Sequence, residues 1–191
     1  MEHLPDEELI ARCACGDRRA MDEIVSRYHG KLLDFAFRHL HDREAAADIA
    51  QSAFIRVFES ADSFRQKASF RTWLYTIAMN LIRDHCRRWK VRPEAPYSEI
   101  EEAAPGDLPT GRRWYSPEEA AVDRIAASWV WEQVDELPES HKAAITLRFR
   151  HGLTYDEIAE VMGAPSGTVK SWIHYGLKSL RESLQPLNCE V

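Results

Sequence analysis

The segment 153–173 limits what this chain can fold into more than any other. Thr154 is a good helix N-cap, and Glu157, three residues on, completes the pattern of a capping box. Gly163 supplies a permissive backbone for a turn, and Pro165 suits the start of a second helix. Two short helices around a tight turn predict a helix-turn-helix, whose second helix can lie in the major groove of DNA. A plain helical hairpin would show the same pattern.

The second of these helices has two chemically different faces. Apolar residues recur at steps of four, four, three and four, which predicts a buried face made of Val169, Ile173, Leu177, Leu180 and Leu184. The other face carries Ser171, His174, Tyr175, Lys178 and Arg181. Trp172 lies at the edge of the apolar face, so both inward and outward packing remain open for it.

Length and composition leave room for one ordinary domain or two small ones in 191 residues. No apolar run is long enough to span a membrane, and the acidic N-terminus has no signal-peptide pattern. We therefore expect a cytoplasmic protein with reduced cysteines. The four cysteines do not match a zinc spacing. Cys13 and Cys15 leave a metal or redox pair open, although small packing thiols explain them more simply.

The distribution of charge is more informative than its net value of −6. Residues 65–92 hold eight basic side chains against the single acid Asp84. Such a segment suits a phosphate backbone, although a solvated helix face would look similar. Residues 93–116 combine prolines and glycines with glutamates, which predicts a flexible acidic linker.

Helix is expected on both sides of that linker, because no segment shows strand alternation over a useful length. The expected spans are 5–15, 17–40 (with a break near Gly30 left open), 43–61, 70–90 and 117–136, followed by a helix from Leu137 and then the helix-turn-helix. The predicted fold is therefore all-α, with two small helical domains joined by a flexible acidic linker, the C-terminal one containing a helix-turn-helix.

Two stretches of the N-terminal half carry candidate binding residues. In the amphipathic helix over 48–58, the expected buried set is Ile49, Ala53, Phe54, Val57 and Phe58, and the outward set is Asp48, Gln51, Ser52 and Arg56. Segment 62–80 mixes aromatic with basic residues, the combination that holds single-stranded nucleic acid by stacking and backbone contacts. Helical spacing assigns its later aromatics to the core, whereas Phe64 precedes a polar loop and is expected to be available.

The order of these motifs resembles a known family. The chain carries an Asp-Ile-x-Gln-x-x-Phe helix, then Phe-x-Thr-Trp-Leu-Tyr-x-Ile-Ala-x-Asn, a basic helix end, an acidic linker, Leu-Thr-Tyr-x-Glu-Ile-Ala and Gly-Thr-Val-Lys-Ser. In this order they are similar to the extracytoplasmic-function group of bacterial RNA polymerase sigma factors, over nearly the whole chain outside the linker. The resemblance implies a region 2 domain over 1–92, a linker over 93–116 and a region 4 domain over 117–191.

The resemblance also implies which residues bind which partner. Core RNA polymerase would be bound by Asp48, Gln51, Ser52 and Arg56, with Ser52 standing where the family often has Glu. The minus-ten promoter element would be bound by Phe64, Arg65, Lys67, Ser69, Arg71, Asn80, Arg83, Arg87 and Arg88. The minus-thirty-five element would be bound by Thr168, Lys170, Ser171, His174 and Lys178. The family often places arginines where this chain has Trp172, Tyr175 and Leu177, so its recognition face holds few cations.

The expected function is that of an alternative sigma factor, which directs promoter-specific initiation and is controlled by an anti-sigma factor, often membrane-bound in the family. We expect no enzymatic activity, cofactor, metal or small-molecule substrate, because no nucleophile–base pair, phosphate loop or metal-ligand spacing is present. The main alternative is a conventional helix-turn-helix regulator that binds DNA without polymerase. A recombinase or resolvase subunit and an adaptor without DNA contact are weaker alternatives.

Overall fold

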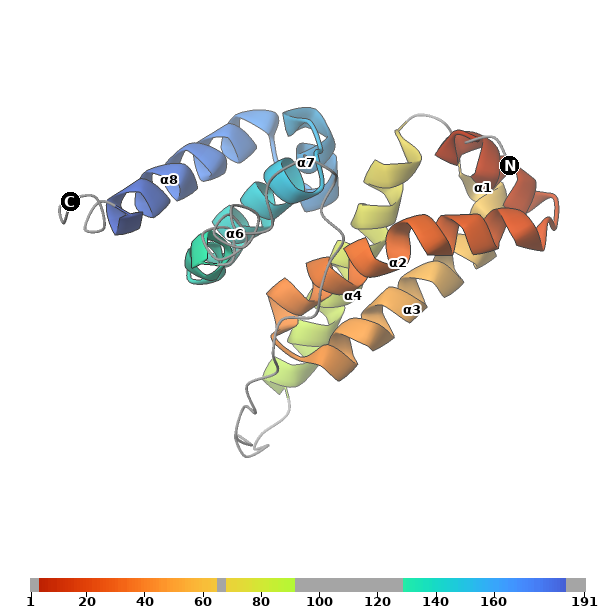
Figure 1. The fold of residues 1–191 in the computed structure, drawn as a ribbon, viewed down its shortest axis with the longest axis horizontal. Coiled ribbons are helices and arrows are strands. Elements are labelled where there is room, and N and C mark those ends of the chain that lie inside the picture. The colour runs from red at the N-terminus through yellow and green to blue at the C-terminus, as the bar shows by residue number, and fades with distance from the viewer. Residues whose placement is uncertain (1–3, 65–67, 92–128, 185–191) are drawn as a thin grey trace, which may run out of the picture.

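The computed structural model describes residues 4–64, 68–91 and 129–184. These residues form helices and no strands, as the sequence predicts. The N-terminal unit comprises α1 (Asp6–Ala14), α2 (Arg18–Leu40), α3 (Arg43–Glu59), the short 3₁₀ turn η1 (Ala61–Ser63) and α4 (Phe70–Val91). The C-terminal unit comprises helical residues 129–135, α6 (Glu139–Ile145), the π-helical turn η2 (Thr146–Arg150), α7 (Tyr155–Met162) and α8 (Ser166–Leu184) (Figure 1).

Local signals explain where the N-terminal helices begin and end. Asp17 caps α2 by accepting a hydrogen bond from the Arg19 backbone N–H, and the helix continues through Gly30 without a break, which settles the point that the sequence left open. His41 adopts a left-handed conformation (φ 52°) that ends α2. Asp42 then caps α3 through the backbone N–H groups of the next turn. The tight turn at 41–42 therefore sets α2 and α3 side by side as a helical hairpin.

The helix-turn-helix forms as the sequence predicts. The Thr154 hydroxyl accepts the Glu157 backbone N–H, and the Glu157 carboxylate accepts the Thr154 backbone N–H, which completes the capping box of α7. Gly163 takes a left-handed conformation (φ 65°) at the turn, and Pro165 precedes α8. Three of the predicted buried residues of α8 are confirmed, namely Val169, Ile173 and Leu180.

One predicted core position of α8 is wrong, and one was missed. Leu177 is 39 % exposed, whereas its neighbour Gly176 is buried against α6. A Cβ atom at position 176 would lie 2.6 Å from Cδ1 of Ile145. The close packing of α8 on α6 therefore depends on a residue without a side chain. Glycine is not counted when a buried face is predicted from the spacing of apolar residues. The side chain of Leu184, also predicted to be buried, lies outside the part of the chain that the structure describes.

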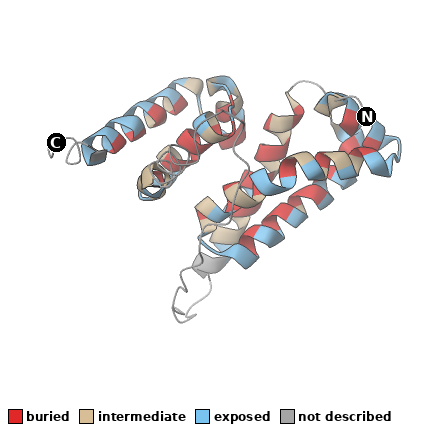
Figure 2. Ribbon diagram, viewed as in Figure 1, coloured by how far each residue is buried: buried red, intermediate tan, exposed pale blue. Residues whose placement is uncertain are grey.

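The two helical units pack on each other, and their buried apolar side chains form one continuous core. Helix α7 lies directly against α4 (Figure 1). Colouring by burial shows the inward stripes of α2, α3 and α4 and of the α6–α8 group as buried, with exposed stripes on the outer sides (Figure 2). The predicted linker 93–116, and most of the helix predicted over 117–136, lie outside the described residues.

Candidate polymerase and nucleic-acid interfaces

The outer face of α3 holds the residues predicted to bind polymerase. Asp48, Gln51 and Arg56 are exposed and Ser52 is half-buried. The same helix exposes two apolar side chains, Ile55 at 50 % and Phe58 at 55 %. The assignment of Phe58 to the core is therefore wrong: the amphipathic pattern placed it on the same buried face as Phe54, yet only Phe54 is buried. Ile55 is not among the residues predicted to bind polymerase, although its position one turn after Gln51 places it on the same face.

The aromatic part of the predicted minus-ten segment is a packed cluster. Phe70 is fully buried, and Phe64 packs on it with ring centroids 6.1 Å apart. Phe64 also lies 5.1 Å from the Trp73 ring. Phe64 is therefore half-buried against the core, which corrects the expectation that it stands free of it. Arg65 and Lys67 lie outside the described residues.

The N-terminus of α4 is occupied by a side chain from the helix-turn-helix. Oε1 of Glu157 accepts hydrogen bonds from the hydroxyls of Ser69 at 2.8 Å and Thr72 at 3.1 Å. Arg71 adds a longer ion pair to Glu157 at 3.9 Å. The guanidinium of Arg71 also reaches the backbone carbonyls of His151 and Gly152, both at 3.4 Å. Two predicted minus-ten residues, Ser69 and Arg71, thus contact the other domain.

The Glu157 carboxylate serves both domains at once, because its other oxygen, Oε2, accepts the Thr154 backbone N–H at 2.8 Å and the Thr154 hydroxyl at 2.9 Å. Burial raises its pKa, but the hydrogen bonds from Thr154, Ser69 and Thr72 outweigh this effect and lower the pKa to about 2. The group is therefore charged at neutral pH.

Further along α4 the predicted DNA residues divide between contact and exposure. Nη2 of Arg83 donates to the carbonyl of Met162 at 2.9 Å, at the C-terminal end of α7. That contact matches a cation to the negative end of a helix. Asn80, Arg87 and Arg88 are exposed, and Arg87 lies 3.6 Å from Asp84 within the same helix.

Helix α8 presents its predicted minus-thirty-five residues to solvent. Lys170, Ser171, His174 and Lys178 are exposed and Thr168 is half-buried. Lys178 lies 3.9 Å from Glu182, one turn on. Trp172 is half-buried and packs against the core, which answers the question that the sequence left open. Tyr175, at 60 % exposure, extends the outward surface.

A second set of interdomain contacts lies at the C-terminal end of α2. Nη2 of Arg150 donates to Oδ1 of Asp34 at 2.9 Å, and Arg38 pairs with Asp135 at 3.0 Å. His39, which is almost fully buried, contacts the Glu139 carboxylate. The guanidinium of Arg38 lies over the Trp131 ring, with Cζ 4.9 Å from the ring centroid. No sequence pattern predicts these contacts, because the partners lie about a hundred residues apart along the chain.

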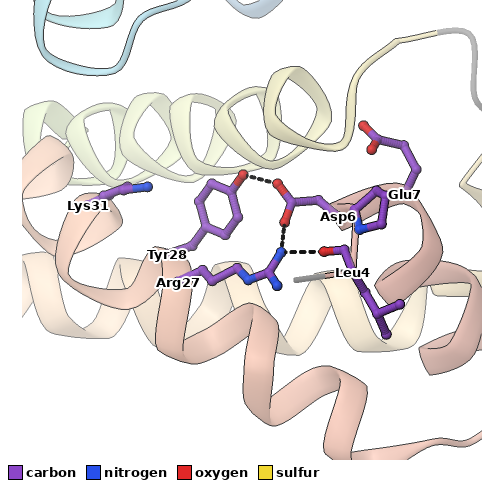
Figure 3. A pocket seen from close by; sticks show the side chains of 7 residues that line it. Leu4, Asp6, Glu7, Arg27, Tyr28 and Lys31 are labelled. Atoms are coloured by element: carbon purple, nitrogen blue, oxygen red, sulfur yellow. Dashed lines mark hydrogen bonds and ion pairs between the residues drawn. The ribbon is translucent and has the colours of Figure 1, made fainter. Parts of the chain in front are cut away.

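A shallow hollow between α1 and α2 is a further surface feature (Figure 3). Its polar groups are joined to one another: Arg27 donates to Asp6 at 2.7 Å and to the Leu4 carbonyl at 2.8 Å, and the Tyr28 hydroxyl donates to the same Asp6. These contacts hold the N-terminus of α1 against α2. They explain the hollow as a structural joint.

The Cys13 and Cys15 side chains lie in different environments. Cys13 is buried in the core of the N-terminal unit, and Cys15 is exposed. Burial raises the pKa of the Cys13 thiol, and the nearby charge of Asp17 acts in the same direction. A thiol with a raised pKa is a poor nucleophile and metal ligand, so packing accounts for Cys13. None of the described helices is both long and apolar enough to cross a membrane.

Comparison with known families agrees with this geometry. Residues 24–91 match the model of sigma-70 region 2, and residues 127–180 match that of sigma-70 region 4. The two matches define the class of RNA polymerase sigma factors, which are non-catalytic transcription initiation factors.

Relatives and solved structures narrow the class. The chain is 38 % identical to RNA polymerase sigma-H factor of Pseudomonas aeruginosa over 95 % of both chains. It is 35 % identical to ECF RNA polymerase sigma-E factor of Haemophilus influenzae, over 97 % of this chain and 98 % of that one. CnrH, solved in complex with the cytosolic domain of CnrY, has the same fold at 23 % identity with a TM-score of 0.63, covering 95 % of this chain and 97 % of CnrH. The chain belongs to the extracytoplasmic-function family of RNA polymerase sigma factors, which direct transcription.

Proposed function

We propose that residues 1–92 and 117–191 form two domains with different binding roles, joined by the linker 93–116. The first domain docks core RNA polymerase through α3 and binds the minus-ten strand along α4. The second reads the minus-thirty-five duplex through α8. The observation that carries this proposal is the separation of faces: α3 and α8 each bury an apolar stripe and expose the family's motif residues.

The docking face on α3 combines polar and apolar groups. Asp48, Gln51 and Arg56 provide directional contacts, and Ile55 and Phe58 provide apolar area that water now covers. Exposed apolar side chains ringed by polar ones are typical of a protein-binding site. We assign these five residues, with Ser52, to polymerase binding.

The minus-ten face on α4 runs from Ser69 and Arg71 through Asn80 to the basic end at Arg87 and Arg88. Cations along one helix follow a phosphate backbone, and an exposed amide such as Asn80 can read a base edge. Arg65 and Lys67 would extend this charge. Phe64 would contribute at the edge of its aromatic cluster, where its side chain is only half-buried and a stacking contact with an unpaired base would form.

Regulation by a partner is part of the proposal. The sigma factor RpoE of Bartonella quintana was solved in complex with the anti-sigma factor NepR. We propose that an anti-sigma factor controls this chain as well, by covering the faces that meet polymerase and promoter. We further propose that the protein acts in the cytoplasm and catalyses no reaction of its own.

Transcription run-off with purified core polymerase on a library of genomic fragments tests the function. Initiation from a restricted set of fragments, dependent on both proteins, is the expected result. Sequence-specific nanomolar binding to duplex DNA by the isolated chain at physiological salt, without such initiation, would instead favour the conventional regulator.

A further inference from the structure

Glu7 in α1 binds the start of α4, the helix to which the proposed function assigns the minus-ten strand. Its Oε1 accepts the backbone N–H of Phe70, the first residue of α4, at 3.1 Å. The N–H groups of a first helical turn have no acceptor inside the helix, and a carboxylate beside them also offsets the positive end of the helix. Figure 3 shows the Glu7 carboxylate turned away from Asp6, toward the start of α4. The first turn of α4 is therefore capped by a side chain 63 residues earlier in the chain.

The acids on either side of Glu7 have other partners. Asp6 accepts hydrogen bonds from two side chains of α2, Arg27 at 2.7 Å and the hydroxyl of Tyr28 (Figure 3). Glu8 is exposed and forms an ion pair within α1. The bonds of Asp6 fix the N-terminus of α1 on α2, so that Glu7, the next residue, is held against α4.

The Phe70 side chain links this cap to the aromatic cluster. It is fully buried, and its ring meets the Tyr28 ring edge-on with centroids 5.6 Å apart. Phe64 and Trp73 also pack on it, each with a ring centroid 6.1 Å away. Helix α1 contacts η1 as well, the turn just before Phe64. Glu7 thus holds the backbone of the residue on whose ring Phe64 rests, and Phe64 is the aromatic side chain proposed to meet an unpaired base.

From these contacts we propose that Glu7 is a positioning residue for the minus-ten strand: by holding the first turn of α4, it fixes the placement of Phe64, Ser69 and Arg71 before the promoter binds. The inference rests on the proposed function of α4. A binding surface that is ordered in advance loses less conformational entropy when it takes its ligand. Glu7 acts through α4 and does not touch the strand itself, since a carboxylate close to phosphates opposes their binding by its charge.

Two substitutions at Glu7 separate its hydrogen bond from its charge. Glu7→Ala removes both, whereas Glu7→Gln removes only the charge and keeps a carbonyl oxygen that can accept the Phe70 N–H. If charge alone mattered, both variants would bind the promoter strand more tightly. If Glu7 positions α4, Glu7→Ala should weaken promoter opening and Glu7→Gln should stay close to wild type. Glu8→Ala is the matched control, because it removes the same charge from the next residue, whose ion-pair partner lies within α1.

Two measurements follow the effect from α4 to the promoter. Permanganate footprinting reports opening of a genomic fragment from which the wild-type holoenzyme initiates in the run-off assay. On the scale of a lost helix cap, Glu7→Ala should lower the apparent affinity for opening about fivefold. Amide hydrogen exchange, followed by NMR on the free full chain, reports the first turn of α4, where Phe70 donates to Glu7 and Trp73 to the Ser69 carbonyl. Both N–H groups should exchange about fivefold faster in Glu7→Ala.

Positioning by Glu7 predicts that co-elution with core polymerase and exchange in the rest of the domain stay as in wild type. Faster exchange throughout the domain with weaker co-elution would mean general destabilisation, and would overturn the positioning role. So would opening that is equal in Glu7→Ala and Glu8→Ala, an equal loss in Glu7→Ala and Glu7→Gln, or faster exchange of the first turn with unchanged opening. If wild-type holoenzyme opened none of the fragments, the proposed function of α4 would itself be refuted, and the role of Glu7 with it.

Discussion

The hydroxyl of Tyr75 lies 2.8 Å from Nδ1 of His151, across the contact between the two domains. Burial raises the pKa of Tyr75, so its hydroxyl stays protonated and donates this hydrogen bond. The imidazole packs edge-on to Phe35, with ring centroids 5.6 Å apart. Burial lowers the pKa of His151 to about 3, and nearby cations, Arg150 first among them, act in the same direction. A neutral histidine is thus part of the interface between the two domains.

Acid should therefore weaken the contact between the two domains and let them separate. The folded pKa of about 3 lies below the ordinary value of 6.5, so the state with His151 exposed binds the extra proton. The stability from this group is fully present above pH 6.5 and is lost as pH falls toward 3, by about 2 kcal/mol at pH 5. Scattering from pH 7.5 to 5 should show a growing radius of gyration.

His151→Gln serves as the control for that experiment, because glutamine is neutral at every pH and can still accept a hydrogen bond. Its radius should stay constant over the same range. Glu157 does not contribute in this window, since its pKa is about 2 and its own effect is lost only below 4.5. A wild-type pH profile retained by His151→Gln would assign the effect to another group.

Glu157→Gln should weaken the interdomain contact while leaving the capping box in place. Glutamine is accepted at this position of a capping box, but it removes the charge that Ser69, Thr72 and Arg71 face. Hydrogen bonds to charged groups contribute about 1.5–3 kcal/mol and neutral ones about 0.5–1.5 kcal/mol, so the expected loss of unfolding free energy is about 1 kcal/mol in a urea melt. Glu160→Gln, exposed on the same helix, is the matched control and should be neutral. An equal loss in both variants would point to the helix rather than to the contact.

Polymerase docking should depend on the apolar as well as the polar side of α3. Asp48→Arg with Gln51→Ala, and separately Ile55→Ser with Phe58→Ser, should each reduce co-elution with core polymerase in gel filtration without unfolding the domain. All four side chains are exposed, so surface truncation costs little stability. Asp22→Arg is the control: it makes the same charge change as Asp48→Arg at a residue of α2 that is also exposed, and it should leave co-elution unchanged.

Much of the fold follows from local rules in the sequence, and the failures have physical reasons. The capping box at Thr154 and Glu157 and the left-handed Gly163 are short-range features, and both formed as predicted. Gly30 did not break α2, because the apolar residues on either side of it continue one buried stripe. Phe58 and Leu177 have the right period for the core but lie at the edges of their stripes, where exposure depends on the neighbouring helix.

The interdomain contact could not be predicted from sequence. Ser69 is 88 residues from Glu157, and Asp34 is 116 residues from Arg150. No periodicity links such positions. The sequence predicted a capping role for Glu157, and Oε2 of its carboxylate does accept the Thr154 backbone N–H. Oε1 of the same carboxylate accepts hydrogen bonds from Ser69 and Thr72 of the other domain. One residue can therefore cap a helix and also make a long-range contact, and only the capping role can be predicted from the neighbouring residues in the sequence.

Recognition of the minus-thirty-five duplex should rest on few cations. Lys170 and Lys178 are exposed on the outward side of α8, while Trp172, where the family often has arginine, packs against the core. Lys170→Ala and Lys178→Ala should each lower the salt dependence of promoter binding by the holoenzyme by about one unit of slope, if each contacts one phosphate. Ser183→Ala, exposed near the end of the same helix, is the control.

Trp172→Arg then separates packing from recognition. Because the indole is half-buried, an arginine can keep its head in water but loses the ring's apolar contacts. We expect a loss of about 1–2 kcal/mol of unfolding free energy, less than for a fully buried charge. A thermal melt and a promoter titration on this one variant measure both effects. Tighter binding with an unchanged melt would show that the ring contributes nothing to the core, and that position 172 belongs to the DNA-reading face.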